Sequence, residues 1–353
     1  MPHRSPALFQ GLFFCASRKA GELVTHCDSY SRPINYLRVS VTDRCNLRCV
    51  YCMPAQGVPW RPPEQILRFE EIATVVRAAA ELGIRKVRLT GGEPLVRLGI
   101  VELVRMLAPI PGIDDLSMTT NGALLDQFAH DLAAAGLKRV NISLDSLRAE
   151  RFAAITRLGK LQQVLQGIEA AHRAGLEPVK INMVVIRDLN DDEVVDFARK
   201  TVSDGWNVRF IEWMPVGTRE CLGRGWMDGL VPAGEIKPRI EQALGTLQPV
   251  DGEGSGPARY YRLPGANGTV GFITPVSEHF CFHCNRLRLT ADGQLRPCLL
   301  SDDEIGLRAA LRGGAGVEAI KALILQAIQR KPQRHHLDQA GRPEKRLMSE
   351  IGG

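Results

Sequence analysis

The sequence predicts an α/β protein whose main part is a partial (β/α)6 barrel of the TIM type, followed by a smaller C-terminal domain. Between residues 31 and 215, short apolar runs rich in β-branched residues alternate with segments of helical periodicity. Strands that alternate with helices need crossover connections and therefore form a parallel sheet. Six such units are present in this part of the chain, and a closed barrel would need eight.

The strands are predicted from short apolar runs that are bounded by polar or turn-forming residues. Val, Ile and Leu dominate these runs, as expected for parallel strands that helices cover. The predicted strands cover residues 37–41, 86–89, 115–119, 139–144, 179–185 and 208–211.

The helices are predicted from apolar residues that recur at intervals of three and four positions. Asp191 and Asp192 stand where an N-cap is expected, and Gly83, Gly136 and Gly175 follow helical segments at the position of a C-terminal cap. The predicted helices cover residues 69–82, 99–107, 125–135, 161–174 and 192–202.

The periodic pattern ends after Pro215, and this divides the chain into four parts. Residues 1–30 form a leader that is acid-free and basic over its first 20 positions, and it is predicted to be flexible. Residues 31–215 form the barrel. Residues 216–271 hold many Gly and Pro and are predicted to be a connecting segment with a ragged hairpin. Residues 272–353 form the smaller domain.

Composition excludes disordered and membrane-spanning classes. The chain has 353 residues, of which 44% are apolar and 24% charged, so a large core can form. No apolar stretch approaches the roughly 20 residues that a membrane span needs. The net charge of +6 permits an anionic partner without requiring one. Six Lys or Arg lie between residues 330 and 346, and such a run usually forms a solvated tail.

The nine cysteines indicate metal binding in a reducing compartment. Six of them fall into two tight triplets, whereas disulfide frameworks belong to small secreted domains that lack a core. We therefore expect a cytoplasmic protein. The basic leader leaves the mitochondrial matrix open as an alternative.

The first triplet is Cys45-x3-Cys49-x2-Cys52, directly after the first predicted strand. Three thiolates on one short loop can bind three corners of a cubane iron–sulfur cluster. Since no fourth cysteine lies nearby, one iron would be open to another ligand. The alternative is a zinc site completed by a distant His or Cys.

Polar residues follow the next three predicted strands at their carboxyl ends. They are residues 90–94 (Thr-Gly-Gly-Glu-Pro), 119–122 (Thr-Thr-Asn-Gly) and 143–146 (Ser-Leu-Asp-Ser). In a barrel the carboxyl ends of the strands form one rim, and this rim carries the functional site. The clusters and the first triplet are therefore predicted to share one site.

The second triplet is Cys281-x2-Cys284-x13-Cys298. It suits a second cubane cluster with an open iron, and Arg286 and Arg288 beside it could address a phosphate or a purine edge. The alternative for this triplet taken alone is a zinc knuckle completed by His279 or His283, a kind of module that often binds nucleic acid.

The first triplet, with Tyr51 before its last cysteine, and Gly91-Gly92-Glu93-Pro94 together resemble the radical S-adenosylmethionine (SAM) superfamily. In that superfamily the open iron binds SAM, and reductive cleavage of SAM yields a radical. The resemblance implies a cluster on Cys45, Cys49 and Cys52. It also implies a SAM pocket lined by Tyr51, Gly92, Ser143 and Met214.

From about residue 32 to its end, the chain resembles one branch of the superfamily, whose members carry two clusters and act on GTP. The matching stretches are residues 37–45, 87–90, 180–182, 209–215 and 285–288, the second triplet, and the Gly352-Gly353 ending. The resemblance implies a second 4Fe-4S cluster on Cys281, Cys284 and Cys298. It implies a GTP site made of Arg38, Arg88, Thr119, Lys180, Arg286, Leu287 and Arg288. Gly352 and Gly353 would enter the active site as a tail. No other catalytic residue is assigned.

In that branch GTP is cyclised to 3',8-cyclo-7,8-dihydro-GTP, the first step of molybdenum cofactor biosynthesis. An electron donor and a downstream cyclic pyranopterin monophosphate synthase are the implied partners, and a homodimer is compatible. No membrane and no nucleic-acid partner is implied. No P-loop is present, so the nucleotide must be held in another way. The alternatives are a radical SAM enzyme that modifies a peptide with an auxiliary cluster, and a zinc protein that binds nucleic acid.

Overall fold

The computed structural model describes residues 25–59, 61–216, 225–251, 256–335, 337 and 343–352. Most of the predicted leader, residues 1–24, and the last residue, Gly353, lie outside the described residues. No helix within the described ranges is long and apolar enough to cross a membrane.

The barrel is built from six consecutive parallel strands, as predicted. They are β1 (Tyr36–Ser40), β2 (Lys86–Thr90), β3 (Asp115–Thr120), β4 (Arg139–Ser143), β5 (Lys180–Val185) and β6 (Asn207–Glu212). Each pairs in parallel with the next. The observed end of each strand lies within one residue of the predicted end, because buried apolar runs locate strands well.

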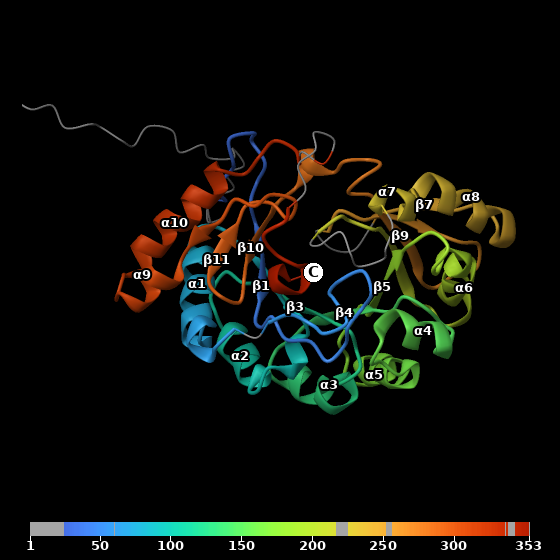
Figure 1. Ribbon diagram of the computed structural model, residues 1–353, viewed down its shortest axis with the longest axis horizontal. Coiled ribbons are helices and arrows are strands. Elements are labelled where there is room, and N and C mark those ends of the chain that lie inside the picture. The colour runs from blue at the N-terminus through green and yellow to red at the C-terminus, as the bar shows by residue number, and fades with distance from the viewer. Residues whose placement is uncertain are drawn as a thin grey trace, which may run out of the picture.

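Helices cover the outer face of these strands (Figure 1). The predicted ones are α1 (Phe69–Glu81), α2 (Ile100–Leu107), α3 (Leu125–Ala134), α5 (Leu161–Arg173) and α6 (Val194–Ser203). Their buried side chains pack on the strands in one core cluster, in which Ile72 and Val76 of α1 and Val87 and Leu89 of β2 are fully buried. A further short helix, α4 (Ala149–Thr156), was not predicted.

The chain after residue 215 extends both edges of the same sheet. Beyond β6 lie β9 (Thr269–Ile273), which is parallel to β6, and the antiparallel strands β8 (Arg259–Arg262) and β7 (Gln248–Val250). Beyond β1 lie β10 (Arg286–Leu289), which is parallel to β1, and the antiparallel strands β11 (Gln294–Arg296) and β12 (Ile305–Gly306). The described strands thus form a single curved sheet of 12.

Helices also accompany this later part of the chain: α7 (Trp226–Gly229), α8 (Ala233–Leu244), α9 (Arg308–Arg312), α10 (Val317–Gln329) and α11 (Met348–Ile351). Helix α8 lies in the segment that was predicted to be a connection. Its Gly234 and its internal Pro238 weaken the sequence signal of a helix, and burial of Ile236 and Ile240 compensates.

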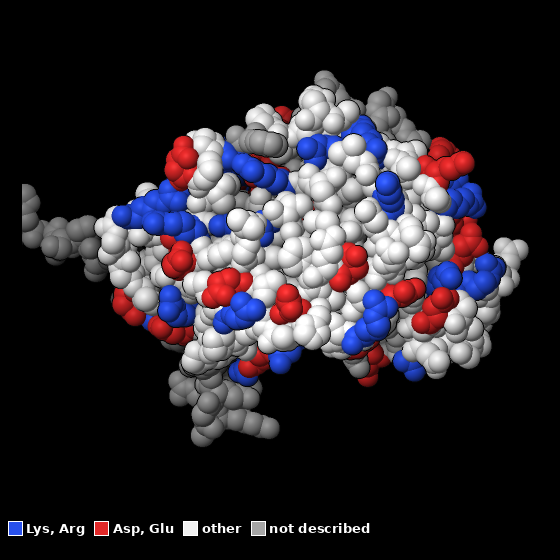
Figure 2. All heavy atoms as spheres, turned by 90° about the horizontal axis from the view of Figure 1, so that it is seen from below, with Lys and Arg blue, Asp and Glu red and all other residues white. Residues whose placement is uncertain are grey.

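The helical face that carries α2, α3 and α5, at the bottom of Figure 1, has no field of one sign. Figure 2 shows this side of the molecule with cations and carboxylates interspersed. Several are paired in salt bridges, such as Arg105 with Glu102. This arrangement does not resemble the continuous basic patch by which proteins bind nucleic acid.

Candidate functional site

One large cavity lies on the inner side of the sheet, and both cysteine triplets line it. Of the predicted SAM and GTP residues, the cavity is lined by Tyr51, Gly92, Ser143, Met214, Arg38, Arg88, Thr119, Arg286 and Arg288. Strands from β1 to β6, together with β9 and β10, contribute to the wall. The structure therefore brings together residues as far apart in the sequence as Tyr36 and Ser349.

The loop that carries the first triplet is held against the end of β2 by two backbone hydrogen bonds and by the close approach that Gly92 allows. The amide of Gly92 donates to the Thr42 carbonyl at 2.8 Å, and that of Glu93 donates to the Arg44 carbonyl at 2.8 Å. A Cβ on Gly92 would lie 2.3 Å from the Arg44 carbonyl oxygen. Any residue with a Cβ would therefore clash with this carbonyl, and only glycine fits here. Gly92 thus fixes the chain just before Cys45, in addition to lining the cavity.

None of the three cysteines of the first triplet forms a disulfide, and their surroundings disfavour ionisation of the thiols unless a metal binds them. Burial, with the nearby Glu93 carboxylate, raises the pKa of Cys45 to about 11, and burial raises the pKa of Cys49 well above its usual range. Metal coordination supplies the positive charge that deprotonates such thiols. The Leu47 amide donates to the Cys45 Sγ at 3.3 Å, as expected of a ligand sulfur that is held in place.

Two buried carboxylates stand next to this triplet. The Tyr51 hydroxyl donates to Asp145 Oδ2 at 2.6 Å, and the Val184 amide donates to Asp145 Oδ1 at 2.9 Å. Glu93 accepts from the Thr120 hydroxyl and the Asn121 amide, both at 2.7 Å. These bonds join the rim clusters that follow β2, β3 and β4, so Tyr51 reaches the cavity in a fixed orientation.

The second triplet lies across the cavity, where β10 and β11 extend the sheet from β1. The Lys331 ammonium is buried and donates to the carbonyls of Arg286 and Pro297 at 2.8 and 2.7 Å. Burial opposes ionisation of Cys284, but the charges of Arg286 and Lys331 outweigh it and lower the pKa of Cys284 to about 6. Cys284 is therefore prepared to bind metal as a thiolate.

The histidines that a zinc knuckle would need are engaged elsewhere or point outward. His279 Nδ1 lies 3.0 Å from Nε2 of His335, and the His283 side chain is exposed. Within the described residues, no three His, Cys, Asp or Glu side chains are arranged to hold a single metal ion.

Three arginines form a row across neighbouring strands. Arg288 of β10 is in register with Arg38 of β1, and Arg38 is in register with Arg88 of β2. Burial, and then the charge of Arg288, lower the pKa of Arg38 well below its usual range. Burial and the charge of Arg286 lower the pKa of Arg288 to about 10. Three cations side by side on one wall of the cavity are suited to a polyanion.

The residues of the cavity wall that were not predicted as site residues include Tyr36, Asn182 and Arg209. Each has a buried polar atom without a hydrogen-bond partner among the described residues, namely Tyr36 Oη, Asn182 Oδ1 and Arg209 Nε. Buried polar atoms are normally paired, so these three are candidates for ligand contact. Inward alternation along β5 and β6 could have indicated Asn182 and Arg209, which are in register with each other.

Two of the predicted GTP residues, Lys180 and Leu287, do not line the cavity. Lys180 is buried at the start of β5, where its ammonium lies 5.3 Å from the centre of the Tyr260 ring and 3.5 Å from the Tyr260 hydroxyl, and it does not line the cavity. The Leu287 side chain is fully buried in the core behind the sheet. The alternation of side chains along β10 places Leu287 on the opposite face from Arg286 and Arg288.

The C-terminal tail enters the barrel. Helix α11, red in Figure 1, lies within the ring of strands, and its Met348 and Ser349 line the cavity. Gly352 follows, and its carbonyl accepts a hydrogen bond of 2.6 Å from Arg288 Nη1. Gly352 does not itself border the cavity, and Gly353 lies outside the described residues.

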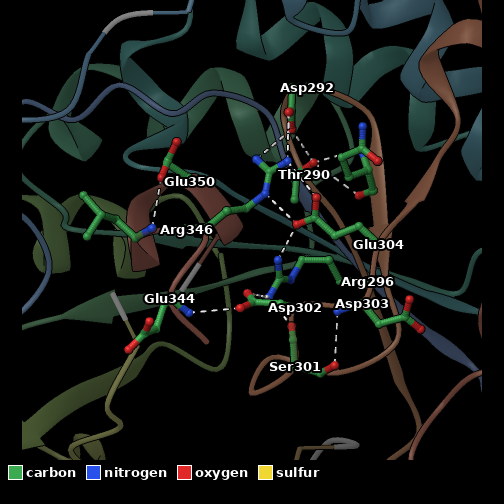
Figure 3. A network of polar contacts seen from close by, with 12 residues as sticks. Thr290, Asp292, Arg296, Ser301, Asp302, Asp303, Glu304, Glu344, Arg346 and Glu350 are labelled. Carbon is green, nitrogen blue, oxygen red and sulfur yellow. Dashed lines mark hydrogen bonds and ion pairs between the residues drawn. The ribbon is translucent and has the colours of Figure 1, made fainter. Parts of the chain in front are cut away.

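An ionic network secures this tail. The Arg346 guanidinium donates to Glu304 at 2.6 and 3.0 Å and to Asp292 at 3.1 and 2.9 Å. Figure 3 shows Arg346 between these two carboxylates, with Arg296 on the far side of Glu304. Arg61 adds an ion pair with Glu350 at 2.8 Å. The prediction of a solvated basic tail is therefore wrong for Lys331 and Arg346. Lys331 donates hydrogen bonds to backbone carbonyls, and Arg346 forms ion pairs with Asp292 and Glu304.

Comparison with known families divides the chain in two. The family model "Radical SAM superfamily" matches residues 39–201, and the model "Molybdenum Cofactor Synthesis C" matches residues 206–337. The first match contains the first triplet and most of the barrel strands. The second contains the second triplet and the strands that extend both edges of the sheet.

Relatives of known name match almost the whole chain. The GTP 3',8-cyclase of Pelotomaculum thermopropionicum is 58% identical over 92% of this chain and 99% of its own length. That of Moorella thermoacetica is 54% identical over the same shares.

Solved structures share the fold at low identity. SuiB of Streptococcus suis bound to S-adenosylmethionine has a TM-score of 0.56 and 13% identity, over 83% of this chain and 68% of its own.

Proposed function

The chain belongs to the GTP 3',8-cyclase family, and we propose that it converts GTP to 3',8-cyclo-7,8-dihydro-GTP in molybdenum cofactor biosynthesis. The observation that carries the proposal is the single cavity in which two cysteine triplets face one row of arginines. A radical source, an auxiliary metal centre and a polyanion site are thereby placed together. The reaction forms a carbon–carbon bond within one substrate, which is consistent with a lyase.

The residues present fit the cofactors of this family, two 4Fe-4S clusters and SAM. Each triplet offers three cysteines that form no disulfide, with no fourth such cysteine among the described residues, and this donor set can bind a cubane and leave one iron open. Cys45, Cys49 and Cys52 would hold the first cluster, and Cys281, Cys284 and Cys298 the second. When bound, the first cluster and SAM supply the carbon-centred radical that starts the reaction. Tyr51, Gly92, Ser143 and Met214 would line the SAM pocket.

The arginine row is proposed to bind the triphosphate of GTP. A triphosphate would relieve the repulsion between Arg38, Arg88 and Arg288, and bidentate contacts would fix its orientation. Arg209 and Asn182 supply further unpaired polar atoms on the same wall. The guanine would lie by the second cluster, close to Arg286. Thr119 lies at the carboxyl end of β3 within reach of the same cavity.

The chain's own contribution to the reaction is placement and shielding. Reacting atoms held in the correct geometry gain several kcal/mol over free encounter. The buried tail from Met348 to Gly352 closes the barrel on the side of β10 and excludes water from the cavity. The Tyr51–Asp145 bond keeps the SAM side of the cavity rigid.

The proposal includes three partners and a location. An electron donor must reduce the first cluster, and a downstream cyclic pyranopterin monophosphate synthase would take the cyclised product. A homodimer is also proposed. A cytoplasmic location is also proposed, because two tight cysteine triplets are typical of metal binding in a reducing compartment.

The test is GTP-dependent formation of 5'-deoxyadenosine from SAM by anaerobically reconstituted protein with a chemical reductant. We expect deoxyadenosine to rise with GTP and a cyclised guanine product to appear with it. Cys281→Ala is the matched variant: it should lose about half of the iron and all product while the first cluster keeps its spectrum. Deoxyadenosine that forms at the same rate without GTP, and with a peptide in its place, would support the peptide-modifying alternative instead.

A further inference from the structure

A second cavity, which we call the outer cavity, borders the first-triplet loop. It has a volume of about 200 Å³ and is lined by Asp43, Arg44, Cys45, Asn46, Arg48, Met53, Val58 and Val96. Cys45 and Met53 also line the inner cavity. The wall between the outer cavity and the first triplet is therefore the loop itself, with a ligand cysteine in it.

The chain around this outer cavity is basic. Residues 44–63 carry three arginines and no Asp or Glu, and residues 155–160 carry Arg157 and Lys160 and again no acid. These two segments are in contact, because Arg157 Nη1 donates to the carbonyls of Arg48 at 2.9 Å and Met53 at 3.1 Å. The single carboxylate in the described lining of the outer cavity, Asp43, is buried.

Large apolar side chains stand exposed beside these cations. Leu158 is 61% exposed and Leu98 is 96% exposed. Leu98 follows Val96 of the cavity lining by two residues, and Leu158 lies between Arg157 and Lys160 in the sequence. We define the outer patch as Arg44, Arg48, Arg157, Leu158, Lys160 and Leu98. Exposed apolar residues rimmed by charges of one sign are typical of a protein-docking surface.

We propose that the outer patch docks an acidic, low-potential electron-carrier protein, which delivers the electron that the proposed function requires. In this step one electron leaves the reduced carrier, which is thereby oxidised by one electron, and enters the cluster held by Cys45, Cys49 and Cys52; no bond forms or breaks. The proposal rests on the proposed function. It is favoured over an anionic small molecule because Leu98 and Leu158 offer no contact to such a ligand.

Charge complementarity determines what such a partner must be. Opposite charges around an interface raise the association rate and select the orientation of docking. A carrier with carboxylates around its redox centre would meet Arg44, Arg48 and Lys160 and bring that centre to the loop. A carrier with a basic surface would be repelled from the same place.

The experiment compares two reductants on reconstituted holoenzyme, with an acidic flavodoxin in its hydroquinone form as the protein probe and dithionite as the chemical one. The test variant is Lys160→Glu. Lys160 precedes helix α5, where a carboxylate is favoured by the helix dipole, and its side chain is exposed. The matched control is Lys138→Glu, the same charge change at the exposed amino end of β4.

We expect the test variant to be reduced by flavodoxin about tenfold more slowly than the parent at low salt, since a rim charge acts mainly on association. The difference should narrow at about 0.5 M salt, where screening is strong. Reduction by dithionite should be unchanged. Calorimetry should show weaker binding of flavodoxin to the test variant and parent-like binding to Lys138→Glu.

Two results would overturn the proposal. One is an equal rate and equal binding of flavodoxin to the test variant and the parent. The other is an equal loss in Lys138→Glu, since the effect would then follow net charge and not the patch. Both results are independent of GTP turnover, so a failure of the proposed function would be seen separately in the dithionite-driven reaction.

Discussion

Arg288 Nη1 donates a 2.6 Å hydrogen bond to the carbonyl oxygen of Gly352, and this bond joins strand β10 to the end of the chain. Arg288 also belongs to the arginine row that faces the cavity. The tail therefore touches the proposed substrate site through a residue of that site. A change at Gly352, the end of the described tail, should therefore affect activity more than it affects folding.

Gly352→Ala should abolish most of the activity with a small loss of stability. Gly352 has φ +88°, and an added Cβ would lie 2.9 Å from Thr90 Cγ2 and 3.1 Å from Ser40 Cβ. The tail must then move away from Arg288, and a displacement of about 1 Å at a reacting site can cost about 100-fold in rate. Thermal unfolding and product formation should be measured together. A large fall in Tm that accompanies the loss of activity would contradict this prediction.

Arg346→Ala should release the tail by removing its ionic anchor. The variant leaves Asp292 and Glu304 without their shared cation, and breaking a buried pair costs about 3–5 kcal/mol. We expect a large loss in the free energy of unfolding and a loss of GTP turnover. Lys345→Ala is the control, because Lys345 is exposed and adjacent. If Arg346→Ala is too unstable to purify, Arg346→Lys should keep the fold and still lower turnover, since Lys cannot bind both carboxylates.

The Arg346 anchor should be insensitive to pH near neutrality. Burial opposes ionisation of Asp292, but hydrogen bonds from Arg346 and Thr290 outweigh it and hold its pKa below the usual value. A carboxyl group with a depressed pKa contributes stability above its unfolded pKa, about 3.9, and loses it as the pH falls through the folded pKa. The stability gap between the parent and Asp292→Asn should therefore be constant from about pH 5 to 8 and close at lower pH. A gap that closes between about pH 6 and 8 would contradict it.

The sequence predicted the barrel because its strands are buried and its helices are amphipathic. Such periodicity is a local property, and it located β1 to β6 and five of the helices. Helix α8 was missed because Gly234 and Pro238 disfavour helix locally, while burial of Ile236 and Ile240 favours it only in the fold. The pairing of β10 with β1 was also out of reach, because it joins residues about 250 positions apart.

In the candidate site, motifs indicate residues whose spacing is set by the chemistry of a metal centre. They do not indicate residues whose position depends on how the strands pack. The cysteine triplets were found since thiolate spacing is set by the metal centre. Leu287 was predicted as a GTP residue, but strand alternation turns its side chain into the core. Asn182 and Arg209 lie in stretches that carry the family resemblance, but no role was assigned to them, and Tyr36 lies in no such stretch. All three stand out in the structure because the fold leaves a polar atom of each buried and unpaired among the described residues.

Tyr36→Phe tests whether these unpaired atoms contact the substrate. The Tyr36 hydroxyl lines the cavity and has no partner among the described residues, so removing it should raise the free energy of unfolding by about 1 kcal/mol, the cost of a buried unpaired group. If GTP is its partner, the KM for GTP should rise about tenfold, as expected for a lost hydrogen bond to a charged group. Tyr30→Phe, at an exposed position, should change neither quantity. Stability and KM would thus rise together in one variant, which a purely structural role of the hydroxyl would not produce. An unchanged KM would remove Tyr36 from the GTP site, whatever happens to the stability.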